Sequence, residues 1–258
     1  MDRESIGAIR DIFKAADEDM LPVLIDRYAS DERAGVQALL KKAGKRLDDL
    51  AAERERLEKM SEFEKKYASF SHICGIDEAG RGPLAGPVVA GAVILNPDTE
   101  ILYLNDSKKL TAAKRDELYD IIMEKSVSAA VGIVGPDVID EVNILQATYI
   151  AMREAVHKLS VLPDILLNDA VTIPQLPMKQ VGIIKGDARS KSIAAASIIA
   201  KVTRDRIMEE YDKEYPVYGF AGHKGYGSRS HIEALEKYGA CPIHRQTFIK
   251  NFNIPKGI

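Results

Sequence analysis

The chain has 258 residues, of which 46% are hydrophobic and 29% charged, and its formal net charge is −3. These values are ordinary for one large globular domain, or one domain with an appendage, and exclude a low-complexity chain. No apolar run approaches about 18 residues, and the N-terminus lacks the layout of a signal peptide. Cys74 and Cys241 form no spaced framework. We therefore expect no contact with membranes and a cytoplasmic location.

Residues 1–69 differ in character from the rest of the chain. They are dense in both signs of charge, contain one proline, Pro22, and carry apolar residues at helical spacing without strand-like alternation. We predict a helical N-terminal extension over residues 1–69, with a linking helix across about 46–68. A second, larger domain is predicted over residues 70–258.

From residue 72 the chain changes to β-branched, apolar runs bounded by glycine and proline, which are typical of strands. These runs predict strands at 72–77, 88–95, 127–134, 164–170 and 180–185. Apolar periodicity predicts helices at 111–125, 137–158, 190–212 and 229–238, the first with Thr111 as its N-cap. The order of these elements indicates the α/β class, with a mixed sheet flanked by helices and a helical C-terminal portion.

The most informative segment, residues 75–87, places Asp77 and Glu78 at the end of an apolar run and before a glycine-rich loop. Neighbours in a strand point to opposite faces, so both carboxylates serve one site only if the chain leaves the strand there. The Ala79-Gly80 pair that follows permits such a bend. Taken alone, the acidic pair is a weak signal, because such a pair is more often a solvated strand end.

Two further acids have the same setting and strengthen the case for a site. Asp169 closes the apolar run 165–168, and Asp187 follows the run 181–186. Because ligands bind where strands end in open α/β sheets, we expect the four acids to gather at one edge. Four carboxylates repel one another unless cations bind them, and an oxygen-only set favours Mg²⁺ or Mn²⁺ over zinc.

The loop Gly80-Arg81-Gly82 also matches a relaxed dinucleotide-binding fingerprint, which would indicate a nicotinamide oxidoreductase. That interpretation requires a helix to begin in the loop. Pro83, Pro87 and a valine-rich run follow instead and favour a strand. The dinucleotide interpretation is therefore a distant alternative.

Three other segments are candidates for contact with a nucleic acid. Tyr226 lies between two glycines and could stack on a base or sugar, although such a ring is often simply packed in a turn. Ser107 and Lys108 precede a helix and could contact phosphates, or could form an ordinary helix-entry turn. Residues 179–206 are rich in lysine and arginine and could grip a phosphate backbone, or form a solvated face.

Taken in order, these motifs closely resemble the type 2 ribonuclease H family, bacterial ribonuclease HII. The resemblance covers roughly residues 72–250. It rests on several separate strings that agree in order and spacing: 75–87, 105–110, 168–169, 185–187 with 192–205, 223–227 and 241–245. One departure is Asn168, since the family often has valine before its third acid.

The resemblance implies a ribonuclease H-like fold and an active site of four acids, Asp77, Glu78, Asp169 and Asp187, that binds two Mg²⁺ or Mn²⁺ ions. It implies that the loop Gly80-Arg81-Gly82 senses the ribose 2′-hydroxyl and that Tyr226 stacks on the adjoining deoxyribose. The expected substrates are RNA–DNA hybrids and duplex DNA with embedded ribonucleotides. Cleavage 5′ to the ribonucleotide would leave 3′-hydroxyl and 5′-phosphate ends.

Two alternatives stay open within this resemblance. A type 3 ribonuclease H shares the fold but carries a partly β N-terminal domain, whereas residues 1–69 favour helices. A non-catalytic module that binds hybrids would gain nothing from four carboxylates placed against phosphate. We expect a monomeric enzyme.

Overall fold

The computed structural model describes residues 4–252 and 254–255. The chain divides into two compact units, Met1–Glu58 and Lys59–Ile258, and each is taken by itself below. None of the helices in the described part of the chain is long and apolar enough to cross a membrane.

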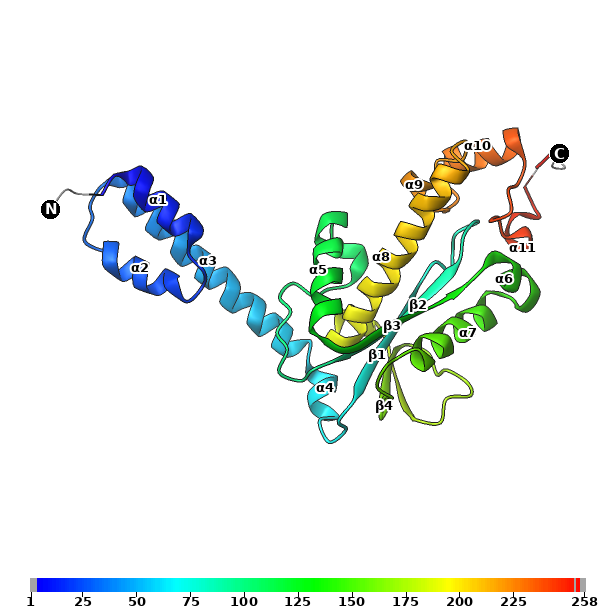
Figure 1. Cartoon of the computed structure of the whole chain (residues 1–258), viewed down its shortest axis with the longest axis horizontal. Helices are drawn as coiled ribbons and strands as arrows, with labels where there is room; N and C mark the ends of the chain where they lie inside the picture. The colour runs from blue at the N-terminus through cyan, green and yellow to red at the C-terminus, as the bar shows by residue number, and fades with distance from the viewer. Residues whose placement is uncertain (1–3, 253, 256–258) are drawn as a thin grey trace. The chain divides into compact units, whose positions relative to one another are not determined.

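The first unit consists of helices α1 (Ile6–Ala15), α2 (Met20–Tyr28) and α3 (Ala34–Lys59), seen in blue in Figure 1. The side chain of Ser5 caps α1 by accepting a hydrogen bond from the amide of Ala8. The helices pack around buried apolar side chains that include Ile9, Leu24 and Val36. This burial, rather than intrinsic helix propensity, holds such short helices together.

The second unit is built on a five-stranded sheet in the order β3-β2-β1-β4-β5. The strands are β1 (Ile73–Ala79), β2 (Val88–Leu95), β3 (Ser126–Val134), β4 (Ile165–Asp169) and β5 (Lys179–Ile183). β1, β2 and β3 pair antiparallel, whereas β1, β4 and β5 run parallel to one another. The predicted mixed sheet is confirmed.

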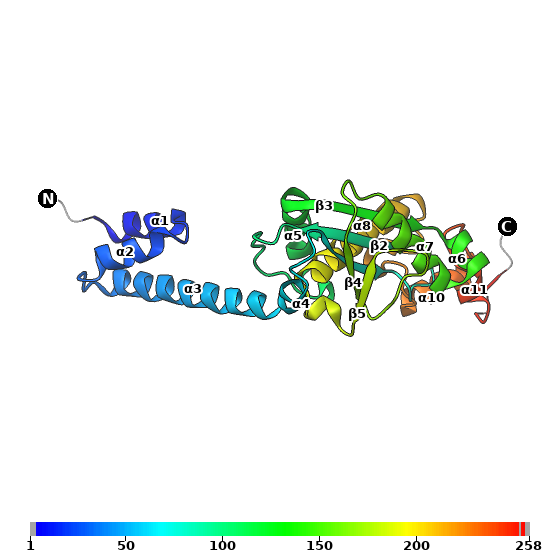
Figure 2. The ribbon, with the colours of Figure 1, turned by 90° about the horizontal axis from the view of Figure 1, so that it is seen from below.

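Helices cover both faces of this sheet (Figures 1 and 2). α7 (Ile144–His157) packs on one face with α6 (Pro136–Val142) beside it, and α5 (Ala112–Lys125) and α8 (Lys191–Glu214) lie on the other. Side chains alternate along β1, so Cys74 and Ile76 join the core beneath α7 while Gly75 faces α8. The remaining short elements are η1 (Ser107–Lys109), η2 (Gly186–Ala188), α4 (Glu62–Lys66), α9 (Phe220–His223), α10 (Arg229–Tyr238) and α11 (Gln246–Ile249).

Two predicted helices differ from the structure. The helix expected over 137–158 is broken at Asn143, whose φ of 70° ends α6 and whose side chain caps α7 by accepting from the amides of Leu145 and Gln146. Asparagine tolerates this backbone region better than most residues, so it can interrupt an apolar period that otherwise runs on. The linking helix expected over 46–68 is instead the end of α3 followed by the separate α4.

The short helix α4 packs with the second unit, although the predicted extension included it. The Oε1 atom of Glu64 accepts hydrogen bonds from the Ser190 hydroxyl at 2.6 Å and from the Ser192 amide at 3.0 Å. These bonds satisfy donors at the N-terminus of α8, where a carboxylate is also favoured by the helix dipole. α4 therefore helps to fix the N-terminal end of the long helix α8.

Candidate active site

Strand register brings Asp77 and Asp169 together. β1 and β4 are parallel neighbours in which Ile76 pairs with Asn168, so the next step along both strands places Asp77 beside Asp169. Gly75, two residues before Asp77, faces α8, and Leu167, two residues before Asp169, packs against Ile193 of α8. Since side chains repeat every second residue along a strand, both acids lie on the α8 face of the sheet.

Asp187 completes a group of three carboxylates. Asp77, Asp169 and Asp187 each offer one oxygen, and these oxygens all lie within 4.8 Å of one another. Asp187 sits in η2, shortly after β5, and this turn is held to β4 because the Gly186 amide donates to Oδ1 of Asp169 at 2.8 Å. Three strands that are adjacent in the sheet therefore deliver three acids to one edge.

The three-acid group is partly withdrawn from water. Asp77 is 7% exposed and Asp187 is 8% exposed. Burial raises the pKa of Asp77 well above its usual value, and the nearby charge of Glu78 adds to the increase. Burial also raises the pKa of Asp187, with further contributions from Asp106 and Asp169. Without a cation, these carboxyl groups bind protons more tightly than exposed ones do.

Glu78 is placed differently, and the expected bend after Asp77 is wrong. β1 continues to Ala79, and Glu78 pairs with Ala90 of β2, so Asp77 and Glu78 leave opposite sides of a continuous strand. The carboxylate of Glu78 lies outside the three-acid group and accepts a hydrogen bond from Arg81 at 3.3 Å. Burial raises the pKa of Glu78, while Arg81 acts in the opposite direction.

The glycine-rich loop lies against Tyr226, a residue that is 47% exposed. A Cβ added to Gly82 would meet nothing closer than Cε1 of Tyr226, at 3.8 Å, so packing does not require glycine there. Gly80 is different, because its φ is +94° and an added Cβ would lie 2.0 Å from Nε of Arg204. The fold therefore explains Gly80, whereas Gly82 borders open space next to the tyrosine.

A chain of neutral histidines holds the main chain at Tyr226. The Cys241 amide donates to Nδ1 of His244, which leaves the proton of that ring on Nε2. His244 then donates to Nε2 of His231 at 3.0 Å, and the Nδ1–H of His231 donates to the Tyr226 carbonyl at 2.9 Å. Burial lowers the pKa of both His231 and His244 to about 4, which keeps both rings neutral at pH 7.

The turn before α5 contributes a further acid that sequence reasoning missed. The Asp106 carboxylate caps η1 by accepting a hydrogen bond from the Lys108 amide, and its charge helps to raise the pKa of Asp187. Burial acts to lower the pKa of Lys108, but the carboxylates of Asp106, Asp77 and Asp187 raise it above its usual value. Lys108 thus lies within electrostatic range of the three-acid group. The sequence could have indicated Asp106, because this acid directly precedes Ser107 and Lys108, which were already candidates for contact with phosphate.

Ser107 is turned toward the interior. It is buried, and its hydroxyl accepts a hydrogen bond from the Ser197 hydroxyl of α8 at 2.7 Å. The predicted contact of Ser107 with phosphate stays a prediction, and this conformation gives the hydroxyl a structural partner instead.

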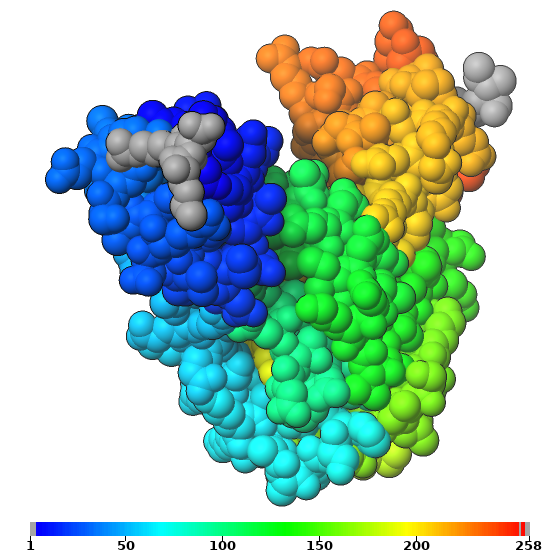
Figure 3. Space-filling view, turned by 60° about the vertical axis from the view of Figure 1, so that its left-hand side comes forward, coloured from blue at the N-terminus to red at the C-terminus, as the bar shows by residue number. Residues whose placement is uncertain are grey.

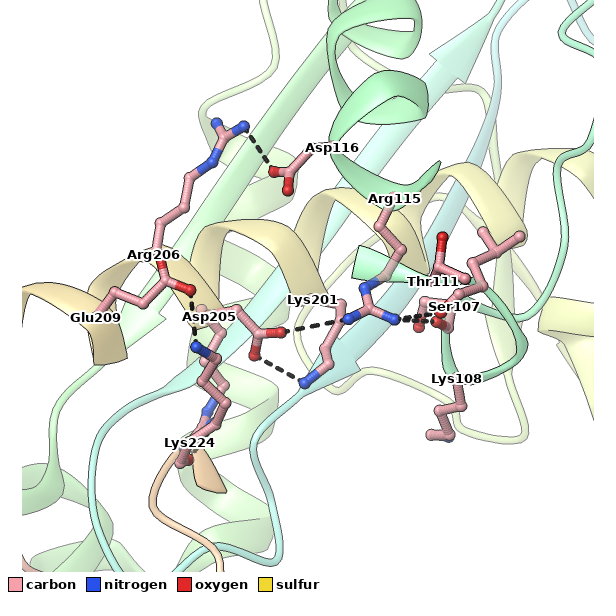
Figure 4. Close-up of polar contacts among 12 residues, drawn as sticks. Ser107, Lys108, Thr111, Arg115, Asp116, Lys201, Asp205, Arg206, Glu209 and Lys224 are labelled. Atoms are coloured by element: carbon pink, nitrogen blue, oxygen red, sulfur yellow. Dashed lines mark hydrogen bonds and ion pairs between the residues drawn. The ribbon is translucent and has the colours of Figure 1, made fainter. Parts of the chain in front are cut away.

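Arg115 of α5 fixes the turn onto α8 (Figure 4). Its guanidinium donates to the carbonyls of Ser107 and Leu110 at 3.0 and 2.6 Å, and it lies 3.8 Å from the carboxylate of Asp205. Asp205 also accepts from Lys201 at 2.7 Å. The position of Lys108 at the site therefore depends on a polar network that spans two helices.

The basic stretch 179–206 does not form one phosphate-gripping face. Arg206 is held by Asp116 of α5 at 3.0 Å (Figure 4), and Arg204 is buried. The reason is helical geometry, because residues two positions apart on α8 point in different directions. Figure 3 shows α8 to α10, in yellow and orange, gathered on the surface beside the green of α5.

The protein-family model of ribonuclease HII matches residues 74–251, and the model of the ribonuclease HII N-terminal domain matches residues 5–68. The chain belongs to the ribonuclease HII family. Ribonuclease HII of Lachnoclostridium phytofermentans is 60% identical over 226 residues, which cover 88% of this chain and 89% of that protein. Ribonuclease HII of Clostridioides difficile is 51% identical over 253 residues, covering 97% and 99%. The chain is accordingly a ribonuclease H type 2 enzyme.

Solved structures of related enzymes share the fold of this chain. The ribonuclease H2 of Pyrococcus horikoshii superposes with a TM-score of 0.60 at 30% identity, over 70% of this chain and 97% of that one. A ribonuclease HIII named Bst-RNase HIII, solved with Mn²⁺, gives a TM-score of 0.51 at 17% identity, over 70% and 63%, and so shows the shared fold alone.

Proposed function

We propose that this ribonuclease HII is a metal-dependent endonuclease that cleaves the phosphodiester 5′ to a ribonucleotide in RNA–DNA hybrids and in duplex DNA with embedded ribonucleotides. The products carry 3′-hydroxyl and 5′-phosphate ends. The observation that carries the proposal is the group formed by Asp77, Asp169 and Asp187 within 4.8 Å, next to a glycine loop and an exposed tyrosine.

The donor set fits a hard divalent cation. It offers only oxygens, which suit Mg²⁺ or Mn²⁺. Burial raises the pKa of Asp77 and of Asp187, and the charge of Asp169 adds to both increases, so the site gains from binding positive charge. When bound, a divalent ion supplies Lewis acidity toward a phosphoryl oxygen and acidifies a water molecule.

The protein's own groups have distinct parts in this proposal. Asp77, Asp169 and Asp187 would hold the ions, and Glu78, which is close enough to Asp169 for that charge to raise its pKa, would add a fourth carboxylate. Lys108, a cation beside the carboxylates, meets a phosphate oxygen of the substrate backbone. Since these groups contact the backbone and not the bases, cleavage is independent of base sequence.

Recognition of ribose is assigned to Gly80, Arg81, Gly82 and Tyr226. A 2′-hydroxyl is what distinguishes RNA from DNA at a given position. The open space at Gly82 lets the loop main chain approach a sugar, and the exposed ring of Tyr226 provides a stacking surface for the next one. The glycine-rich loop and Tyr226 lie side by side, so they could contact two neighbouring sugars of one strand.

Gly82→Ala tests this assignment. We expect the variant to fold with a melting temperature close to that of the wild type, because the new methyl group meets only the Tyr226 ring edge at 3.8 Å. Cleavage at a single ribonucleotide should fall by about tenfold or more, since the methyl group intrudes where the sugar enters. Steady-state kinetics and thermal melting measure the two effects. A variant that folds and cleaves at the wild-type rate removes Gly82 from the site.

The proposed reaction itself is tested with a labelled duplex that carries one ribonucleotide. Incubation with Mg²⁺ or Mn²⁺ should give a single cut on the 5′ side of the ribonucleotide, and EDTA should abolish it. An all-DNA duplex is the control and should stay intact. Cleavage at another position, or cleavage in EDTA, contradicts the proposal.

We further propose that the enzyme works as a cytoplasmic monomer. Both cysteines, Cys74 and Cys241, are buried and free, which suits a reducing compartment. Sedimentation of the purified protein with and without substrate measures the oligomeric state.

A further inference from the structure

Two buried arginines lie beneath the glycine-rich loop and the loop that carries Tyr226, which are called the recognition loops below. Arg204 of α8 is 1% exposed, and Arg245, just before α11, is 0% exposed. Among the residues that the structure describes, neither has a carboxylate at ion-pair distance. Burial, together with the charge of Arg204, lowers the pKa of Arg245 to about 9. Such a charge is tolerated inside a protein only when its N–H groups are satisfied.

Main-chain carbonyl groups satisfy these guanidinium groups. Each arginine donates three hydrogen bonds, with lengths between 2.6 and 3.1 Å. The acceptors are the carbonyls of Gly80, Arg81 and Gly86 for Arg245, and of Ala85, Pro87 and Lys224 for Arg204. A planar guanidinium presents its donors in a fixed fork, so it fixes the acceptors relative to one another.

Arg204 joins the two recognition elements. It holds the glycine-rich loop through Pro87 and the tyrosine loop through Lys224, with N···O distances of 2.9 Å in both cases. Its guanidinium carbon also lies 5.9 Å from the centroid of the Tyr226 ring. Gly80 lies so close to Nε of Arg204 that it leaves no room for a side chain. Arg204 therefore helps to set the separation of the loop from the ring, together with the main-chain hydrogen bond that the Leu84 amide donates to the Gly225 carbonyl at 2.8 Å.

We propose that Arg204 is a positioning residue that sets the spacing between the loop Gly80–Gly82 and Tyr226, and thereby the selectivity for a lone ribonucleotide over a long hybrid. The inference rests on the proposed function. A lone ribonucleotide offers one 2′-hydroxyl and one ribose–deoxyribose junction, so the loop and the ring must engage neighbouring sugars at once. A long hybrid offers a 2′-hydroxyl at every step and no such junction, so it depends less on that spacing.

Arg204→Lys is the test, because lysine keeps the positive charge but loses the planar fork. The matched control is Arg206→Lys, two residues further along α8, where the exposed guanidinium bonds only Asp116 among the hydrogen-bond partners described. kcat and KM are measured for a duplex with one ribonucleotide and for an RNA–DNA hybrid. We expect the ratio of the two kcat/KM values to fall by about 10- to 100-fold in Arg204→Lys. Arg206→Lys should keep the wild-type ratio, and Mn²⁺ affinity should be unchanged in both variants.

The two kcat/KM values distinguish a role of Arg204 in positioning the loops from a role in the general stability of the protein. Equal losses on both substrates, or an unchanged ratio, overturn the inference, because a merely structural residue affects both substrates alike. If Arg204→Lys does not fold, Arg245→Lys carries the same prediction through Gly80 and Arg81, and an unchanged ratio there overturns it. If the wild-type protein cleaves neither substrate, it is the proposed function that fails.

Discussion

We expect Asp77→Asn to abolish cleavage while the protein still binds its duplex substrate. Asp77 lies at the centre of the proposed metal site, where its oxygen is within 4.8 Å of those of Asp169 and Asp187. An amide cannot supply the negative charge that a divalent ion needs, and metal assistance is worth several kcal/mol of transition-state stabilisation. Since about 1.4 kcal/mol is tenfold in rate, the loss should be on the order of 10³-fold or more.

Single-turnover cleavage and a gel-shift titration measure the two parts of this prediction. The control is Asp98→Asn, which neutralises an exposed carboxylate outside the site and should cleave at the wild-type rate. Metal-dependent cleavage by Asp77→Asn at the wild-type rate would remove Asp77 from the metal site. Loss of duplex binding would show that the variant had lost more than chemistry.

The second large effect concerns stability. Burial raises the pKa of Asp77, so the folded protein binds this proton more tightly than the unfolded chain does. Ionised Asp77 therefore destabilises the metal-free fold at pH values above its raised pKa, and the penalty disappears as the pH falls toward about 4, the value for an unfolded aspartate. We expect Asp77→Asn to melt higher than the wild type in EDTA at pH 8, by a margin that shrinks toward pH 5.

Saturating Mn²⁺ should reverse this order at pH 8. A ligand present at about 100 times its Kd stabilises the folded state by about 2.7 kcal/mol, and the wild type should gain this whereas Asp77→Asn gains little. Thermal melting at several pH values, with EDTA or Mn²⁺, measures both effects. Asp98→Asn should follow the wild type throughout. If Mn²⁺ does not change the melting temperature of the wild type at pH 8, the proposed metal site is contradicted.

The fold class and the meeting of three acids followed from the sequence because both depend on local pattern. Apolar runs locate the strands, and acids at the ends of parallel strands reach a common edge whatever the exact register. The α/β class and the helical N-terminal segment were confirmed. Asp77, Asp169 and Asp187 come together as that argument expects.

What the sequence could not give depends on long-range geometry. The position of Glu78 depends on where pairing with β2 ends, and that pairing extends two residues beyond the predicted end of the strand. Asp106 joins the site because Arg115 and the hydrogen bond from Ser197 to Ser107 fasten its turn to α8. Arg204 belongs to a basic stretch, yet its burial beneath two loops depends on contacts with residues more than 100 positions away.

In the proposed reaction, Asp77, Asp169 and Asp187 bind the divalent ions on which cleavage depends. Anomalous diffraction from crystals of the wild-type protein equilibrated with Mn²⁺ tests this claim most directly. We predict an anomalous peak at coordination distance from Asp77 and at least one of the other two aspartates. A protein batch that cleaves in Mn²⁺ but shows no peak between these carboxylates would contradict the account.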